Sequence, residues 1–391
     1  MENLETHLNV AKKYNRAALI IGIIGLATAL AGFFINQQQF YYSYLTAFVF
    51  WTTITLGGLF FTLVHNVTNA AWSTVLRRIM ETIMMTVPLM AALAVPVLLG
   101  LHDLYHWSHA DEVAGDVLLQ KKAPYLNIPF FTIRTIFYFA VWFLLARYLY
   151  KLSLQQDRNF DPGQTEKLRK ASAPGIVLFA FTITFAAFDW LMSLDPHWYS
   201  TIFGVYIFAG SYLSAIAMIV LIALALRKQG ILADKITVEH YHDLGKFLFS
   251  FTVFWGYMAF SQYFLIWYAN IPEETIWYFH RWEGNWKIIT LLLVFGHFLI
   301  PFLALLPRAA KRNLTFMKLI SIWILIMHFC DLYWIIMPTL HAHGFHLSWI
   351  DLATFAGIGG IFIWYFWWRY SKEEPIPVNA PRLEESVKLV N

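Results

Sequence analysis

The chain of 391 residues is 59% hydrophobic and 18% aromatic, and only 13% of its residues are charged. Because a soluble domain carries about 25% charged residues, this composition excludes an ordinary water-soluble globular protein and predicts that lipid surrounds most of the chain. The single cysteine, Cys330, excludes an internal disulfide and a cysteine-ligated iron–sulfur cluster held by this chain alone. The net charge of +4 becomes informative only when the basic residues are assigned to loops.

Ten segments are apolar over the length of about 20 residues that a membrane-spanning helix needs. In chain order they lie at 17–36, 44–65, 82–101, 128–150, 173–194, 202–226, 246–269, 286–306, 316–338 and 349–369. The polar N-terminus "MENLETHLNVAKKYNR" has no small-residue cleavage site before the first segment, so we expect no cleavable signal peptide. The predicted fold is an all-α integral membrane protein with ten transmembrane helices, numbered here as spans 1 to 10.

The basic residues predict the orientation of these spans, because cytoplasmic loops carry an excess of Lys and Arg. One set of loops comprises both termini and the connections 66–81, 151–171, 227–245 and 307–315. With the flanking helix ends, this set holds 23 of the 28 Lys and Arg residues. The opposite set holds only four. We therefore expect a multi-pass protein of the bacterial inner membrane with both termini in the cytoplasm.

The loops are too short to form a soluble domain, since the longest has about 25 residues. The predicted organisation is one ten-span membrane domain, 1–371, followed by an extended cytoplasmic tail, 372–391. Prolines and mixed charges in the tail predict an arm that lies on a neighbouring subunit or is disordered.

The outer loops are acidic and hold eight of the 14 histidines. Two interpretations are open, a surface for docking a partner or a solvated rim. The tract "HAHGFH" at 341–346 resembles a metal-binding segment. We expect no metal there, because no Cys or carboxylate accompanies it at a fixed spacing.

Ionisable residues within the spans are the candidate functional residues, because an ionised side chain at mid-bilayer costs roughly 2.5–3.5 kcal/mol and is normally paired, neutral or functional. The candidates for a proton path or polar cavity are Asp189, Asp331, Arg134, His328, His297 and Glu81. His65 marks the inner end of span 2, as Glu81 does for span 3. No residue is predicted to act as a catalytic group.

Two groupings of these residues follow from their depth. Arg134 and Asp189 lie at matching depth on adjacent antiparallel spans, which predicts either a structural ion pair or a polar cavity open to the outer side for a quinol head group or a proton exit. His297 and His328 also lie at similar depth, and Asp331 follows His328 on one helix face. They are interpreted as a satisfied interior pair, as a proton relay with Asp331, or as ligands of a b-type haem, for which the surroundings hold too few small residues.

A weak internal repeat predicts how the spans are grouped. Span 5 ends in "FDWLMSLDPHW" and span 9 in "CDLYWIIMP", so an aspartate precedes a tryptophan at the outer end of both. Spans 2–5 and 6–9 are therefore predicted to form two parallel four-helix bundles, flanked by spans 1 and 10.

Three long motifs carry a family resemblance. They are "FAAFDWLMSLDPHWYSTIFGVYIFAGSYLSA" at 185–215, "WYFHRWEGNWKIITLLLVFGHFLIPFLALLPRAAKRN" at 277–313 and "CDLYWIIMP" at 330–338. They resemble the ActF subunit of alternative complex III, a bacterial quinol:cytochrome c oxidoreductase, within the NrfD-like polysulfide-reductase membrane-anchor family. Spans 5 to 10 carry the resemblance clearly, and the earlier spans carry it by layout.

The resemblance implies a respiratory electron-transport subunit that braces the complex, with a possible role in proton translocation. It implies no redox cofactor in this chain, which is not expected to be catalytic alone. Quinol, iron–sulfur clusters and c-type haems are expected in partner subunits: a sister NrfD-like membrane subunit, a periplasmic iron–sulfur subunit, c-type cytochromes and a terminal oxidase. We expect lipid contacts and no contact with nucleic acid.

Two other functions remain open from the sequence. The chain could itself bind quinol in an outer-side pocket near Arg134, Asp189 and Asp331. It could also be a secondary transporter, although transporters favour inverted repeats, whereas the repeat detected here is parallel.

Overall fold

The structure is a computed structural model that describes residues 2–159, 161 and 163–390, with side chains from residue 14 onward. The predicted ranges 1–371 and 372–391 include four residues that lie outside this description: Met1, Phe160, Pro162 and Asn391. Helices make up 81% of the chain, and the described residues contain no strand. The all-α prediction is confirmed.

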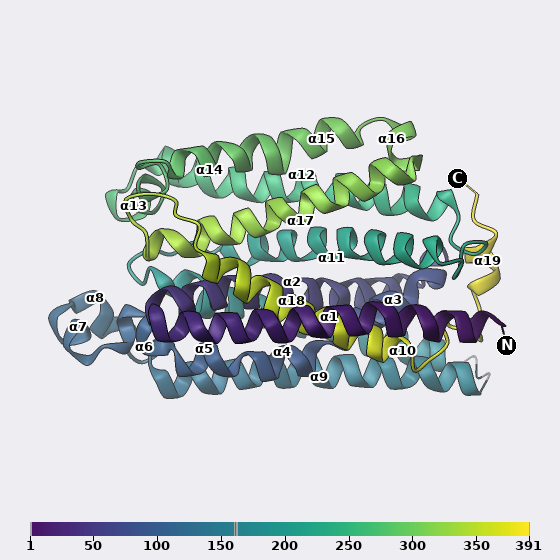
Figure 1. Cartoon of the computed structure of the whole chain (residues 1–391). Coiled ribbons are helices and arrows are strands. Elements are labelled where there is room, and N and C mark those ends of the chain that lie inside the picture. The colour runs from purple at the N-terminus through teal and green to yellow at the C-terminus, as the bar shows by residue number, and fades with distance from the viewer. Residues whose placement is uncertain (1, 160, 162, 391) are drawn as a thin grey trace.

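The helices of the first half are α1 (Glu2–Ile35), α2 (Gln37–Thr68), η1 (Thr74–Leu76), α3 (Arg77–Met84), α4 (Val87–Leu93), α5 (Val95–Leu99), α6 (Leu101–Leu104), η2 (His106–Ser108), α7 (Ala110–Gly115), α8 (Val117–Lys122), α9 (Ile128–Arg158) and α10 (Gly163–Trp190). Those of the second half are η3 (Met192–Leu194), α11 (Phe203–Lys228), α12 (Val238–Ala269), α13 (Pro272–His280), α14 (Trp286–Leu292), η4 (Leu293–Leu299), α15 (Ile300–Leu305), α16 (Arg308–Arg312), α17 (Leu314–Ile336), η5 (Met337–Thr339), α18 (Trp349–Tyr370) and α19 (Leu383–Val387). The long helices run side by side (Figure 1).

Nine helices or runs of consecutive helices in the described part of the chain are long and apolar enough to cross a membrane. They overlap nine of the ten predicted spans, which makes the chain a multi-pass membrane protein. The remaining predicted segment, 246–269 (span 7), lies within α12. This helix has 32 residues but carries many Trp and Tyr side chains, and it is not among the nine.

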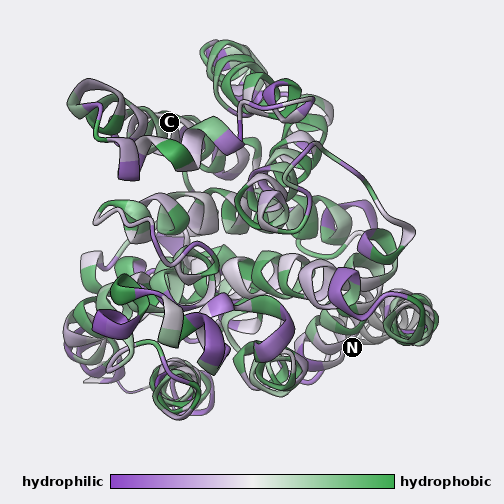
Figure 2. Ribbon diagram, turned by 90° about the vertical axis from the view of Figure 1, so that its left-hand side faces the viewer, coloured by the Kyte–Doolittle hydropathy of each residue, from purple (hydrophilic) through white to green (hydrophobic). Residues whose placement is uncertain are grey.

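The centre of the fold is formed by α2 and α11. In their most apolar stretches, 89% and 83% of the residues are buried, whereas the corresponding value for α1 is 28%. α2 packs against α3, α10, α11 and α18, and α11 packs against α12 and α17. The peripheral helices therefore present their apolar side chains to lipid. Figure 2 views the bundle end-on and shows hydrophobic residues, in green, on helices throughout it.

Glycine allows two close helix crossings. A Cβ atom at Gly57 of α2 would lie 2.4 Å from the backbone oxygen of Ser211 in α11. A Cβ atom at Gly25 of α1 would lie 2.5 Å from the backbone nitrogen of Gly357 in α18. Small residues at such crossings let helix backbones approach, which is how apolar helices associate in lipid.

Both termini lie at one end of the bundle, which we call the terminal end, and α6–α8 and α13 lie at the other, which we call the loop end (Figure 1). The tail 372–390 packs on the chain's own helices at the terminal end. The Ser386 hydroxyl donates to the backbone oxygen of Trp72 at 2.8 Å and accepts from the backbone N–H of Val75 at 3.1 Å. Asn379 donates to the backbone oxygen of Asp157 at 2.7 Å. The tail is thus anchored on its own bundle through the start of span 3, and this contact was not expected from the sequence.

Candidate functional site

Arg134 of α9 and Asp189 of α10 form a closed ion pair near the loop end. The guanidinium donates to both carboxylate oxygens, from Nε at 2.8 Å and from Nη2 at 2.9 Å. Tyr138 donates its hydroxyl to the same carboxylate at 2.7 Å, and Nη1 of Arg134 donates to the backbone oxygen of Tyr125 at 2.9 Å. Asp189 is fully buried, and the Tyr125 ring lies 3.8 Å from the guanidinium carbon.

This geometry is that of a structural ion pair, the first of the two interpretations made from depth. Two-point Arg–carboxylate contacts are among the strongest polar contacts in proteins. Both oxygens of Asp189 already accept hydrogen bonds from side chains of this chain. Because Asp189 is also fully buried, a quinol head group would have to open this packing to reach it.

Asp331 of α17 lies in a second cluster and has a different environment. It accepts hydrogen bonds from the Tyr206 hydroxyl of α11 and, at 3.1 Å, from the Trp255 indole of α12. The residue is only 2% exposed. Both of these donors are neutral, so Asp331 lacks the cation that Asp189 has in Arg134.

His297 is joined to Asp331 through the same tryptophan. Its ring stacks on Trp255 with centroids 3.9 Å apart. The side chain is fully buried, and neither ring nitrogen has a hydrogen-bond partner among the described residues. His297 is therefore a buried base with both nitrogens available.

His297 lies in a π-helical turn, η4, and the sequence explains how this turn is stabilised. The Ile300 N–H donates to the Phe295 oxygen five residues back. Pro301 has no N–H for the next such bond, and the Trp323 indole of α17 donates to the Gly296 oxygen at 2.7 Å instead. Turns of this kind occur frequently at functional sites.

His328 is the third member of the second cluster. The Thr53 hydroxyl of α2 donates to the backbone oxygen of Phe50 at 2.7 Å, so it accepts from His328 Nε2, which lies 2.9 Å away. This tautomer leaves Nδ1 with a lone pair and with no partner in the described part of the chain. A Cβ atom at Gly210 of α11 would lie 3.1 Å from the His328 ring and 3.8 Å from Trp255, so this glycine makes room for both.

The predicted candidates thus fall into two networks rather than one outer-side group. Arg134 and Asp189 form the first, and Asp331, His297 and His328 form the second. Among the described residues, the side-chain hydrogen bonds of Asp189 and Asp331 share no partner. These contacts therefore do not support a single cavity lined by Arg134, Asp189 and Asp331.

Glu81 lies in a third network, at the terminal end. It pairs with Arg77 at 3.2 Å and with Arg78 at 2.7 Å, and Arg78 also contacts Asp157 of α9. Glu81 is 1% exposed, and Arg78 is fully buried. These contacts fasten the start of span 3 to the end of span 4.

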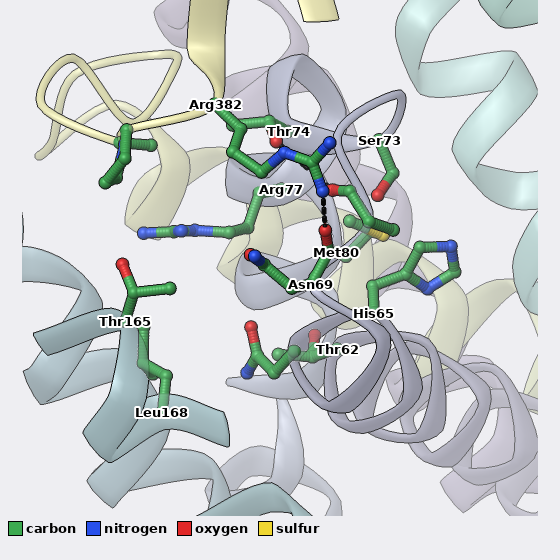
Figure 3. Close-up of a pocket in the computed structure, with 14 residues that line it drawn as sticks. Thr62, His65, Asn69, Ser73, Thr74, Arg77, Met80, Thr165, Leu168 and Arg382 are labelled. Atoms are coloured by element: carbon green, nitrogen blue, oxygen red, sulfur yellow. Dashed lines mark hydrogen bonds between the residues drawn. The ribbon is translucent and has the colours of Figure 1, made fainter. Parts of the chain in front are cut away.

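His65 lies apart from Glu81, on a small cavity. Its Nδ1 is 2.8 Å from the backbone oxygen of Phe61. The cavity holds about 40 Å³, and Arg77 lies on another side of it. Figure 3 shows both side chains around this cavity, with Arg382 of the tail donating to the backbone oxygen of Asn69.

Sequence reasoning missed Asp351, at the start of the last span. It is 2% exposed and accepts from Ser43 of α2 at 2.5 Å, from the Ser348 backbone N–H at 2.7 Å and from Tyr333 of α17 at 3.2 Å. The signal was present as a serine three residues before an acid at the start of an apolar run, which is a capping-box pattern. Asp351 thus caps α18 and ties it to α2 and α17.

Acidic and histidine side chains meet at the loop end around a cavity of about 580 Å³. The His197 imidazole is 2.5 Å from Asp116, and this hydrogen bond holds the pKa of the Asp116 carboxyl below its usual range. Arg281 closes one side of the cavity and donates to the backbone oxygens of Trp334 and Ile335. Within the described residues, no group of three or more His, Cys, Asp or Glu side chains is placed to hold a metal ion.

Comparison with known proteins assigns no family. No protein-family model matches the chain, and no curated protein matches it. The resemblance of the three sequence motifs to the alternative complex III subunit therefore stays a prediction.

Proposed function

We propose that this chain is a membrane subunit, with no redox cofactor of its own, of a bacterial quinol:cytochrome c oxidoreductase of the alternative complex III type. It braces the complex in the inner membrane and carries protons through its second helix bundle. Support comes from the three motifs at 185–215, 277–313 and 330–338, which contain Asp189, His297 and Asp331. The motifs thus include residues from both buried networks near the loop end.

The proposal includes ten spans, with α12 as the seventh. α12 is as long as α2 and packs against α11, α15 and α17. Its contacts support a bundle of spans 6–9, and those of α10 with α2 and α9 support one of spans 2–5. α1 packs mainly on α18, as expected if spans 1 and 10 flank the two bundles. In this arrangement both termini face the cytoplasm.

The observation that carries the proton role is the Asp331–Trp255–His297 cluster with His328 beside it. A carboxylate and two imidazoles are the usual groups of a proton relay within a membrane. Within the part of the chain that the structure describes, Asp331 has only neutral donors, and three imidazole nitrogens of the cluster have no partner. These groups can take up and release a proton without breaking an ion pair, which Arg134 and Asp189 cannot.

Other buried polar atoms extend this cluster toward the terminal end. The Ser321 hydroxyl lies two helical turns before His328 on the same face of α17 and has no hydrogen-bond partner within the described chain. The same holds for the hydroxyls of Tyr212 in α11 and Tyr241 in α12. Buried polar atoms without a protein partner are the places where internal water binds, and such water would connect the relay.

The loop end is the proposed docking face for the iron–sulfur and cytochrome subunits. Its cavity of about 580 Å³ is lined by acidic and histidine side chains of the connections between spans. Charged rims of this kind steer partners and fix their orientation.

Two measurements test this function. Affinity purification of the tagged chain from its native membranes should recover an iron–sulfur protein and multihaem c-type cytochromes, identified by mass spectrometry and haem staining. The purified assembly should reduce cytochrome c with quinol. Recovery of the chain alone, or with partners that hold no redox centre, would contradict the proposal.

A further inference from the structure

At the terminal end, a cavity distinct from the one beside His65 opens between α9 and the end of α18. The proposed function makes no use of it. Its volume is about 290 Å³. It is lined by one acid, Glu373, and by four cations: Arg147, Lys151, Arg158 and Arg369. Such a basic pocket between membrane helices has the character of an anion site.

These cations differ from most basic residues at the same end. Arg77, Arg78, Lys246 and Arg312 each pair with an acid of this chain. Within the described residues, Arg147, Lys151 and Arg158 make no side-chain hydrogen bond or ion pair, and the Nε of Arg369 is buried without a partner. Their charges therefore remain available for a ligand.

The base of the cavity supplies one more donor. Tyr150 lines it and is 5% exposed, yet its hydroxyl has no hydrogen-bond partner among the described residues. The guanidinium carbon of Arg369 lies 4.8 Å from the Tyr150 ring centroid and that of Arg78 lies 5.8 Å from it. These two contacts hold the Tyr150 ring in the wall of the cavity.

The surface of α9 next to the cavity indicates what kind of molecule carries the anion. Phe137, Leu144, Lys151 and Arg158 follow one another at intervals of seven residues and lie on one stripe of the helix. Phe137 and Leu144 are 56% and 63% exposed, so the stripe is apolar toward the middle of the membrane and basic at its end. A free phosphate would use only the basic half of this stripe, whereas a phospholipid would use both halves.

We propose that this cavity binds the phosphate of an anionic phospholipid, with the acyl chains lying along Phe137 and Leu144. Arg147, Lys151, Arg158 and Arg369 supply the charge, and Arg side chains match phosphate with two-point contacts. Tyr150 donates a hydrogen bond to a phosphate oxygen. A lipid with two phosphates, cardiolipin, makes the fullest use of four cations.

Native mass spectrometry of the full chain in a non-ionic detergent tests this site. Cardiolipin, phosphatidylcholine and inorganic phosphate are titrated separately, and the dissociation constant of the first bound molecule is measured. Each basic residue near an anionic lipid contributes about 1 kcal/mol, so Arg147→Gln should weaken cardiolipin binding about fivefold and Arg147→Gln with Lys151→Gln about 25-fold. Lys318→Gln is the matched control, because Lys318 is an exposed cation at the same end and lies outside the cavity.

Cardiolipin should bind more tightly than phosphatidylcholine, and the Lys318 variant should bind it as the wild type does. Thermal unfolding without added lipid should be unchanged in every variant, since none of these side chains loses a protein partner. Equal binding by the wild type and the double variant would overturn the proposal, as would an equal loss in the Lys318 variant. Displacement of cardiolipin by millimolar inorganic phosphate would instead assign the site to a free anion. None of these readouts depends on quinol oxidation.

Discussion

Replacing Asp189 by Asn is the sharpest test of the first buried network. The side chain keeps its size, but one carboxylate oxygen becomes an amide that donates hydrogen bonds. Arg134 then faces one acceptor and one donor in place of two acceptors, and its charge is no longer neutralised. The packing around the site is unchanged, so any effect reports on the ion pair.

The expected loss is large because the pair is buried. Removing one partner of a buried ion pair costs about 3–5 kcal/mol, since the other charge stays in the low-dielectric interior. Arg134→Met alone should cost a similar amount, because Asp189 then keeps only Tyr138 as a donor. The double variant carries no charge at the site, so its free energy of unfolding should lie within about 2 kcal/mol of wild type.

The assay is reversible unfolding of the purified chain in mixed micelles with increasing SDS, followed by the fluorescence of its 17 tryptophans. Lys318→Met, at an exposed position near the start of α17, controls for the loss of a cation that has no partner among the described residues. The coupling energy between positions 134 and 189 should be at least about 3 kcal/mol. Additive single losses would show that the pair is not the stabilising unit. Unchanged stability of Asp189→Asn, together with reduced turnover, would assign Asp189 a direct role in proton transfer.

The other predictions concern the second network and the helix crossings. His297→Phe should keep the stacking on Trp255 and change stability by less than about 1 kcal/mol, because no hydrogen bond is lost, yet it should lower proton-coupled quinol turnover. Asp331→Asn should likewise lower proton-coupled turnover, which is followed by proton uptake in proteoliposomes, with little loss of stability. Gly25→Leu should separate α1 from α18 and cost at least about 1–3 kcal/mol of unfolding free energy. Gly115→Ala, where an added Cβ meets no atom within 4 Å, should be neutral in the same assay.

The sequence was sufficient for the positions of nine of the ten predicted spans and for one of the polar networks. Span positions depend on local hydropathy, which needs no knowledge of the fold. The Arg134–Asp189 pair could be predicted because an isolated charge in a membrane demands a partner and only one lay at the same depth on the next span. Charge is rare in this chain, so each buried charge is informative.

The aromatic residues that bond to the aspartates of the two networks could not be predicted, because aromatic residues are common in this chain whereas charges are rare. Tyr138, Tyr206 and Trp255 donate hydrogen bonds to the two buried aspartates, but 18% of the chain is aromatic, so no single aromatic residue stands out. The π-helical turn at His297 depends on Trp323, which is distant in sequence. Asp351 was overlooked because an acid near the end of a span is normally an interfacial residue.

The two aspartates occupy matching places in the predicted internal repeat, but their surroundings differ. Asp189 faces the Arg134 guanidinium in a closed pair. Asp331 faces Tyr206 and Trp255, with His297 stacked on the indole. A buried carboxylate with no fixed cation is most readily neutralised by a proton. Asp331→Asn mimics that protonated form and Asp189→Asn destroys a pair, so the stability losses of these two matched variants should differ by at least about 2 kcal/mol. Equal losses would mean that Asp331 carries a fixed charge and cannot exchange a proton in the way proposed.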